Sequence, residues 1–206
     1  MIHIEYTDLS GLEEEVYQKL YALASPQRQQ RADRYLRKED AHRCIVAEAL
    51  LRHALGADST ELSLTPEGKP FLPGRSDVHF NLSHSGRWVV IAWGDQSVGI
   101  DVEMIAMNKG KEQLARHFFH AEEQDYLFAA QDRERALRFY EIWTKKESYL
   151  KYLGTGINRA LSSFSVLQPP EVSFSTHFFE DALCTLCAKN IRCEILPVTV
   201  QQLLSE

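Results

Sequence analysis

Two carboxylates stand two residues apart in the segment VGIDVE, at Asp101 and Glu103. Side chains alternate between the faces of an extended strand, so both carboxylates point one way and Val98, Ile100 and Val102 point the other. Neighbouring carboxylates repel each other unless a cation lies between them. Mg²⁺ takes one or two carboxylates and completes its shell with water and phosphate oxygens. The pattern fits a magnesium site, and it also fits an exposed acidic strand face.

A second charged group lies in WTKKESYLK, which has helical spacing. Trp143, Glu147 and Lys151 recur every four residues and therefore share one row of a helix. In a functional interpretation Glu147 faces a cleft as a third metal ligand or a base, and Lys151 contacts a phosphate. In the alternative they form a surface ion pair worth only about 0.2–0.5 kcal/mol.

Three further segments carry groups that bind anions. His84 lies between two serines in FNLSHS, and such a histidine can hydrogen-bond a phosphate oxygen. Lys69 in the loop EGKP is a candidate contact to a phosphate or to a base, or an ordinary turn lysine. Residues 28–43 hold six basic side chains against three acidic ones, and the arginine fork matches phosphate geometry. A solvated helix face with ion pairs would look the same.

The chain has four cysteines, of which Cys184 and Cys187 form a C-x-x-C pattern. The surrounding ALCTLCA is typical of a strand, where residues three apart point to opposite faces. We therefore expect buried thiols rather than a metal or redox site.

Helices and strands must position these residues. Ser25 followed by Pro26 predicts a helix start, because serine caps helices and proline suits the first turn. The remaining pattern predicts a helix over 40–55, a loop over 65–74, strands over 78–85, 88–93 and 97–103, a helix over 139–153, and strands within 172–189, which RCEILPV follows.

A helix ending in Leu-Gly and followed by strands occurs twice. This predicts a weak internal duplication of an α+β unit, although two unrelated hairpins would give the same pattern. We expect an α+β fold with an N-terminal half over 1–106 and a C-terminal half over 107–206.

Composition excludes several classes of protein. The 206 residues carry 23 basic and 29 acidic side chains, a net charge of −6, and 44% are hydrophobic, which is typical of a globular chain of one or two domains. The negative charge argues against a general nucleic-acid partner. No apolar run is long enough to span a membrane, and the first residues lack a secretory signal. We expect a cytoplasmic protein with reduced thiols.

Together, FNLSHS, GIDVE and WTKKESYLK resemble the 4′-phosphopantetheinyl transferases, in order and in separation. The resemblance is to the larger, two-halved subfamily that includes the surfactin synthetase-activating enzyme, and it covers about residues 25–166, with EGKP and RKEDAHR. It implies two similar α+β halves related by a pseudo-twofold, an active site between them, and a monomer. It also implies Mg²⁺-dependent transfer of the phosphopantetheine arm of coenzyme A to a serine of an apo acyl or peptidyl carrier protein, with release of adenosine 3′,5′-bisphosphate.

The resemblance also assigns roles by position. It makes Asp101, Glu103 and Glu147 metal ligands and Lys151 a catalytic phosphate contact. Our hypothesis for the base is Glu147, directly or through a metal-bound water, and Glu122 or Glu123 is the alternative. Cys44 stands where some relatives carry a hydroxyl, which puts one coenzyme A contact in doubt. The implied coenzyme A contacts are Arg28, Arg31, Gly68, Lys69, Pro70, Ser83, His84 and Lys151.

Since carrier proteins are generally acidic around the modified serine, a basic or apolar rim is expected. Residues 109–119 offer Lys109, Lys111, Arg116 and Phe118 or Phe119, although the phenylalanines could equally be core. Two other functions fit the same residues. One is a Mg²⁺-dependent phosphohydrolase that uses water as acceptor, and the other is a non-catalytic module that binds coenzyme A or a carrier.

Overall fold

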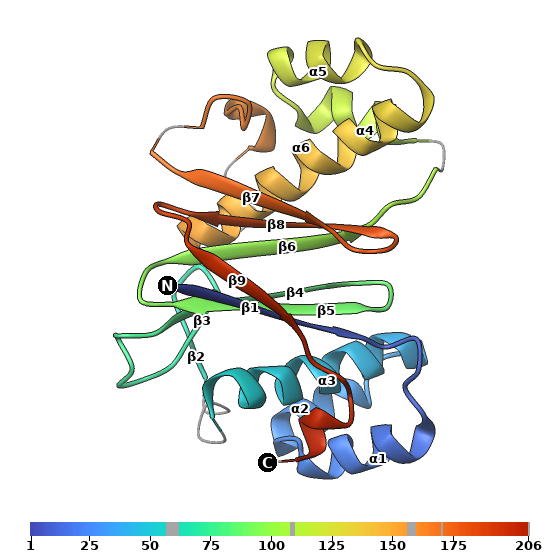
Figure 1. The fold of residues 1–206 in the computed structure, drawn as a ribbon, viewed down its shortest axis with the longest axis vertical. Coiled ribbons are helices and arrows are strands. Elements are labelled where there is room, and N and C mark those ends of the chain that lie inside the picture. Colours follow the sequence, from blue (N-terminus) through green and yellow to red (C-terminus); the bar gives the residue numbers. More distant parts are fainter. Residues whose placement is uncertain (57–61, 108–109, 156–159, 170, 206) are drawn as a thin grey trace.

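The fold has four layers, with helices outside and two β-sheets facing each other inside (Figure 1). It was obtained as a computed structural model, which describes residues 1–56, 62–107, 110–155, 160–169 and 171–205. Helices and strands are both abundant, so the predicted α+β class is confirmed. No helix among these residues combines the length and apolar character needed to cross a membrane.

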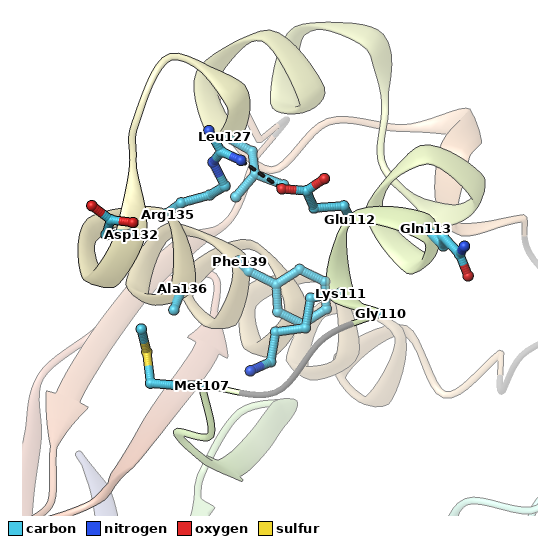
Figure 2. A pocket seen from close by; sticks show the side chains of 10 residues that line it. All are labelled: Met107, Gly110, Lys111, Glu112, Gln113, Leu127, Asp132, Arg135, Ala136 and Phe139. Carbon is cyan, nitrogen blue, oxygen red and sulfur yellow. Dashed lines mark hydrogen bonds and ion pairs between the residues drawn. The ribbon is translucent and has the colours of Figure 1, made fainter.

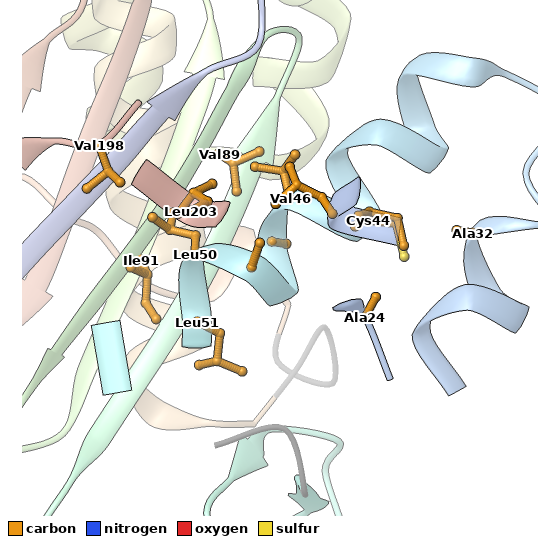
Figure 3. Packing of buried hydrophobic residues seen from close by; sticks show 14 of the residues in the cluster. Ala24, Ala32, Cys44, Val46, Leu50, Leu51, Val89, Ile91, Val198 and Leu203 are labelled. Atoms are coloured by element: carbon orange, nitrogen blue, oxygen red, sulfur yellow. The ribbon is translucent and has the colours of Figure 1, made fainter. Parts of the chain in front are cut away.

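The first sheet has the strand order β4-β5-β1-β9 and is antiparallel except for the parallel pair β1–β9. Helix α3 lies on its outer face, where Val46 and Leu50 join Val89 and Ile91 of β5 in one buried cluster (Figure 3). The elements of this half are β1 (Ile2–Asp8), α1 (Glu14–Leu23), α2 (Pro26–Ala32), α3 (Lys38–Leu55), β2 (Ser63–Leu64), β3 (Pro70–Phe71), β4 (His79–Ser85), β5 (Trp88–Gly94), β9 (Cys193–Pro197) and η4 (Gln202–Leu204).

The second sheet is antiparallel, with the order β6-β8-β7. Helix α6 packs on its outer face, and a cluster of buried aromatic and aliphatic side chains joins α4, α5 and α6 to it. The elements are β6 (Val98–Met104), α4 (Lys111–Phe118), α5 (Ala121–Phe128), α6 (Asp132–Leu153), η3 (Leu161–Ser163), β7 (Ser173–Phe178) and β8 (Ala182–Ala188).

A third cluster of fully buried side chains fills the space between the sheets. Ile4 and Val90 contribute to it from the first sheet, and Val98, Ile100 and Val102 from β6. The predicted alternation along VGIDVE is therefore confirmed, because the apolar side chains enter this core and Asp101 and Glu103 face the other way, toward α6. The two sheets form one packed body.

The strands cross the division expected at residue 106 (Figure 1). Strand β6 lies before residue 106 but pairs with β8 in the second sheet, and β9 lies after it but pairs with β1 in the first. Both long helices end at a glycine of positive φ, Gly56 (94°) and Gly154 (70°), as the sequence predicts. A β-hairpin follows each helix, β4–β5 and β7–β8, but a pseudo-twofold between the halves stays a prediction.

The C-x-x-C pattern has the structural role expected for it. Cys184 and Cys187 lie on β8 in two different buried clusters, on opposite faces of the second sheet. All four cysteines are free, and burial raises the pKa of Cys187 to about 12. Cys184 and Cys187 are therefore core side chains.

Candidate active site

Helix α6 lies unusually close to β6, and Gly99 makes this approach possible. A Cβ at Gly99 would lie 2.0 Å from Ser148 O and 2.3 Å from Tyr152 N, closer than any real contact. The last turns of the helix therefore rest on the strand and bring Glu147 and Lys151 to the face that carries Asp101. Gly99 was not among the residues predicted from the sequence, although a glycine inside a strand often marks a close backbone approach.

Lys151 is bound to β6 by two contacts and to β4 by one. Its Nζ donates to Asp101 Oδ1 (2.7 Å), to the carbonyl of Ile100 (3.1 Å) and to Ser83 Oγ (2.9 Å). The surface ion pair with Glu147, which the helical spacing allowed, does not form within the described residues, and Asp101 takes its place. Ser83 is buried and donates its own proton to Asp101 Oδ1 (3.0 Å), so β4, β6 and α6 meet at one carboxylate.

Three carboxylates, those of Asp101, Glu103 and Glu147, interact electrostatically with Lys151. Burial and the charge of Asp101 raise the pKa of both Glu103 and Glu147, and Lys151 opposes this shift. Asp101 Oδ2 is buried and has no hydrogen-bond partner among the described residues. An unpaired carboxylate oxygen beside two carboxylates of raised pKa fits a cation, since a nearby positive charge would favour all three ionised forms.

The three carboxylates are nevertheless not assembled as a ligand set. Over the part of the chain that the structure describes, no group of three or more His, Cys, Asp or Glu side chains is arranged to hold a metal ion. Lys151 binds one oxygen of Asp101, while Glu147 lines a neighbouring cavity together with Lys151. The roles of Asp101, Glu103 and Glu147 as metal ligands therefore stay a prediction.

A cavity of about 370 Å³ connects this acidic centre to a cluster of cations. Arg28, Arg31 and His84 line it together with Asp101 and Lys151. Burial lowers the pKa of His84, and the charges of nearby basic side chains lower it further, which favours the neutral imidazole with one donor and one acceptor. With Pro70 and Ser83, which also line it, the cavity brings together seven of the predicted site residues from five different elements.

Arg28 is held in place by the buried carboxylate of Glu48, which no sequence pattern had indicated. Its Nε donates to Glu48 Oε2 (3.1 Å), and the same oxygen accepts from the hydroxyl of Ser25 (2.8 Å), the predicted cap of α2. Arg28 Nη1 also lies 3.9 Å from Cys44 Sγ, a weak contact. Glu48 therefore fixes the start of α2 against α3 and orients the guanidinium toward the cavity.

The EGKP loop forms an adjoining cavity of about 240 Å³, lined by Gly68, Lys69, Pro70, Glu147 and Lys151. Pro70 and Lys151 also line the larger cavity, so the two are neighbours. Lys69 Nζ donates to the carbonyls of Val98 and Tyr152 (both 3.2 Å), and burial lowers its pKa to about 8. In this structure Lys69 therefore ties the loop to β6 and α6.

Neither of the alternative bases lines the two cavities of this centre. Glu123 is fully buried and accepts from Lys146 Nζ (2.8 Å), Val166 N (2.8 Å) and His120 N (2.8 Å), which leaves it no access to a substrate. Glu122, next to it on α5, is exposed and lies 4.0 Å from the ring of His120. The proposal that Glu123 acts as the base is therefore wrong, because its carboxylate is used to hold α5 against α6.

The expected carrier rim is only partly exposed. Phe119 is 1% exposed and belongs to the core, and the Phe118 ring packs edge-on to that of Trp143. Lys111 Nζ lies over the Tyr140 ring (4.6 Å), while Arg116 is exposed. Lys109 lies outside the described residues.

Lys111 also lines a cavity of about 560 Å³ between α4 and the start of α6 (Figure 2). Beside this cavity, Glu112 and Arg135 form an ion pair (2.5 Å). None of the residues predicted to bind coenzyme A or metal lines it, so the largest cavity described here is separate from the Lys151 centre.

Cations that face a carboxylate cluster across one cavity define a site for a phosphorylated substrate. Residues 97–193 match the family model of the 4′-phosphopantetheinyl transferase superfamily, and residues 12–96 match that of the 4′-phosphopantetheinyl transferase N-terminal region. The chain is 37% identical to a 4′-phosphopantetheinyl transferase of Bacillus subtilis over 154 residues, covering 72% of this chain and 68% of that protein.

Two further relatives extend this match. The chain is 35% identical over 164 residues to the 4′-phosphopantetheinyl transferase Sfp of Bacillus subtilis strain 168, which covers 75% of this chain and 71% of Sfp. It is 31% identical over 196 residues to the transferase gsp of Aneurinibacillus migulanus, covering 86% and 81%. The chain belongs to the 4′-phosphopantetheinyl transferase superfamily and is an enzyme of this class.

Proposed function

We propose that the enzyme transfers the 4′-phosphopantetheine arm of coenzyme A to a serine hydroxyl of an apo acyl or peptidyl carrier protein. The observation that supports this most is the cavity in which Arg28, Arg31 and His84 face the Lys151–Asp101 pair. Arginine forks bind phosphate oxygens in pairs, so the basic end suits the phosphates of coenzyme A. The part of the cavity lined by Asp101 and Lys151 is then left for the reacting phosphorus and the incoming hydroxyl.

The reaction is a displacement at phosphorus. The carrier serine oxygen forms a bond to the phosphorus on the pantetheine side, and the bond from that phosphorus to the bridging oxygen breaks. Adenosine 3′,5′-bisphosphate leaves with the bonding electrons. The raised pKa of Glu147 suits it to accept the serine proton, because a base works best when its pKa lies closer to the working pH. Lys151 stabilises the charge that develops on the phosphate oxygens.

Asp101, Glu103 and Glu147 would hold Mg²⁺, and the unpartnered Asp101 Oδ2 supports this assignment. When bound, the ion neutralises charge on the diphosphate as a Lewis acid. Lys151, which lines the cavity with Asp101, would attract the negative oxygens of the diphosphate.

The carrier surface is proposed on α4, which exposes Leu114 (43%) and Arg116. An apolar side chain beside a cation suits an acidic partner with an apolar contact. Activity as a monomer stays a prediction. A cytoplasmic location also stays one, and the four unpaired cysteines support it, because thiols remain free in reducing compartments.

The direct test is to incubate the enzyme with coenzyme A, Mg²⁺ and an apo carrier protein, and to weigh the carrier by mass spectrometry. We expect a phosphopantetheine increment, and its loss by at least about 100-fold in Asp101→Ala and Glu147→Gln, which remain folded by circular dichroism. Cleavage of coenzyme A without carrier modification would identify a hydrolase. Near-normal transfer by both variants would refute the residue assignment.

A further inference from the structure

Strands β4 and β6 lie side by side but belong to different sheets, and side chains replace the backbone ladder between them. Asn81 Oδ1 accepts from Ile100 N (2.8 Å), Ser83 Oγ from Val102 N (3.2 Å) and Ser85 Oγ from Met104 N (3.2 Å). The donors and acceptors both advance by two residues, so the three bonds form one regular series. A polar side chain at every second position of β4 thereby satisfies every second N–H of β6.

The two hydroxyls in this series also hold the two carboxylates of β6. Ser83 Oγ donates to Asp101 Oδ1 (3.0 Å), and Ser85 Oγ donates to Glu103 Oε2 (2.8 Å). Each serine thus accepts from the N–H that follows a carboxylate residue and donates to that carboxylate. A hydroxyl with both its donor and acceptor roles fixed cannot rotate freely, so it directs the carboxylate it binds.

The two carboxylates differ in how many other groups hold them. Asp101 is also held by Lys151, whereas Ser85 is the one hydrogen-bond partner of the Glu103 carboxylate among the described residues. Ser85 is half-buried, and Glu103 is too. Loss of the Ser85 hydroxyl would therefore release Glu103 while leaving Asp101 in place.

We infer that Ser85 is a positioning residue, which orients the Glu103 carboxylate for a divalent cation that it shares with Asp101. This inference rests on the proposed metal-dependent function. Hydrogen bonds from outside the ligand set fix the orientation of metal-binding carboxylates, and their removal typically weakens metal affinity by roughly 10- to 100-fold. The structure assigns this task to the second serine of SHS, whereas the first serine shares Asp101 with Lys151.

The first measurement is a calorimetric titration of Mg²⁺ into the full-length enzyme with coenzyme A bound. The second is the rate of carrier modification as a function of Mg²⁺ concentration. For Ser85→Ala we expect about a 10-fold or larger loss of Mg²⁺ affinity and a rate at saturating Mg²⁺ within about threefold of the parent. Ser85→Thr, which keeps the hydroxyl, should restore affinity. Ser175→Ala is the matched control, since its hydroxyl bonds His177 (3.0 Å) on β7 and should change neither quantity.

A double variant keeps the inference open to refutation if Ser85→Ala proves unstable. Because Ser85 acts through Glu103, adding Ser85→Ala to Glu103→Gln should cost little further Mg²⁺ affinity. Unchanged Mg²⁺ affinity in Ser85→Ala, a rate loss that saturating Mg²⁺ does not repair, or full additivity in the double variant would overturn this inference alone. A parent enzyme that binds no Mg²⁺ and modifies its carrier equally well in EDTA would overturn the proposed metal site, and this inference with it.

Discussion

Helix α6 carries two lysines that pair with buried carboxylates, and the two pairs are built differently. Lys146 and Glu123 are both 0% exposed, and Lys146 Nζ also donates to the carbonyls of Leu161 and Phe164 (both 2.7 Å). Glu123 in turn accepts from two backbone N–H groups. Five residues further along, Lys151 is 28% exposed and faces a cavity, and its partner Asp101 keeps one oxygen unpaired within the described residues.

The difference separates a structural ion pair from one available for chemistry. Every polar atom of the Lys146–Glu123 pair has a partner inside the protein, so the pair fixes α5 and η3 against α6 and has nothing left to offer a ligand. The Lys151–Asp101 pair lines a cavity, and Asp101 Oδ2 is an acceptor without a partner among the described residues. Burial alone therefore does not identify a functional lysine or carboxylate here; incomplete pairing beside a cavity does.

The largest expected effect comes from breaking the closed pair. Lys146→Met leaves Glu123 charged, buried and unpaired, which costs about 3–5 kcal/mol of unfolding free energy. Urea denaturation measures this loss, and the molecules that remain folded should keep their affinity for coenzyme A. Lys151→Met is the matched control on the same helix, and we expect it to lose transfer while losing much less stability.

The reverse result, with Lys146→Met stable but unable to bind coenzyme A, would contradict the distinction between the pairs. The double variant Lys146→Met/Glu123→Leu sharpens the test. It removes the unpaired charge, so part of the lost stability should return.

An intermediate effect is expected from Gly99→Ala, which acts on the geometry of the open pair. A methyl group would meet the backbone of Ser148 and Tyr152, which cannot move as a flexible side chain does. We expect about 1–3 kcal/mol of destabilisation from overpacking and at least a 10-fold loss of transfer, because α6 shifts away from β6. Gly11→Ala is the control, since nothing lies within 4 Å of a Cβ there; equal effects at both positions would contradict this account.

The smallest effect concerns pH. The pKa of Glu147 is raised above its ordinary value of 4.5 in the folded protein, chiefly by burial and by Asp101, so its ionisation opposes folding. The stability that its protonated form contributes is present below about pH 4.5 and is lost as the pH rises through the folded pKa. In EDTA, Glu147→Gln should therefore be more stable than the parent at pH 7, by less than about 1 kcal/mol after solvent screening.

This gain should vanish near pH 4, where the parent is also protonated. Thermal denaturation at the two pH values measures it, with the exposed Glu122→Gln as control. By contrast, Glu123→Gln should be destabilising at pH 7, because it weakens the closed pair. A loss of stability in Glu147→Gln at pH 7 would show that Glu147 stabilises the fold instead.

Local patterns in the sequence were enough to predict most elements. Alternation along VGIDVE predicted the two faces of β6, and Ser25-Pro26 and Gly154 predicted where helices begin and end. These predictions succeeded because side-chain period, capping and positive φ depend on a few neighbouring residues. The row of Glu147 and Lys151 on one helix was predicted for the same reason.

Partners across the molecule were not predictable in this way. Helical spacing suggested that Lys151 pairs with Glu147 one turn away, but Asp101, 50 residues distant, lies closer in space. The sequence left Glu123 as a candidate base, but packing buries it against Lys146. The expected division placed residues 193–197 in the second half, but as β9 they pair with β1. Pairwise contacts between remote segments depend on how whole layers pack.

The sequence by itself determined the kinds of elements, the family and the residue types that handle phosphate, because these follow from local periodicity and from motifs in fixed order. Only the tertiary structure decided which lysine is enclosed and which faces the cavity, since both lie on one helix in one motif. The physical reason is the packing of α6: one side is sealed by α5 and η3, and the other rests on Gly99 beside two carboxylates.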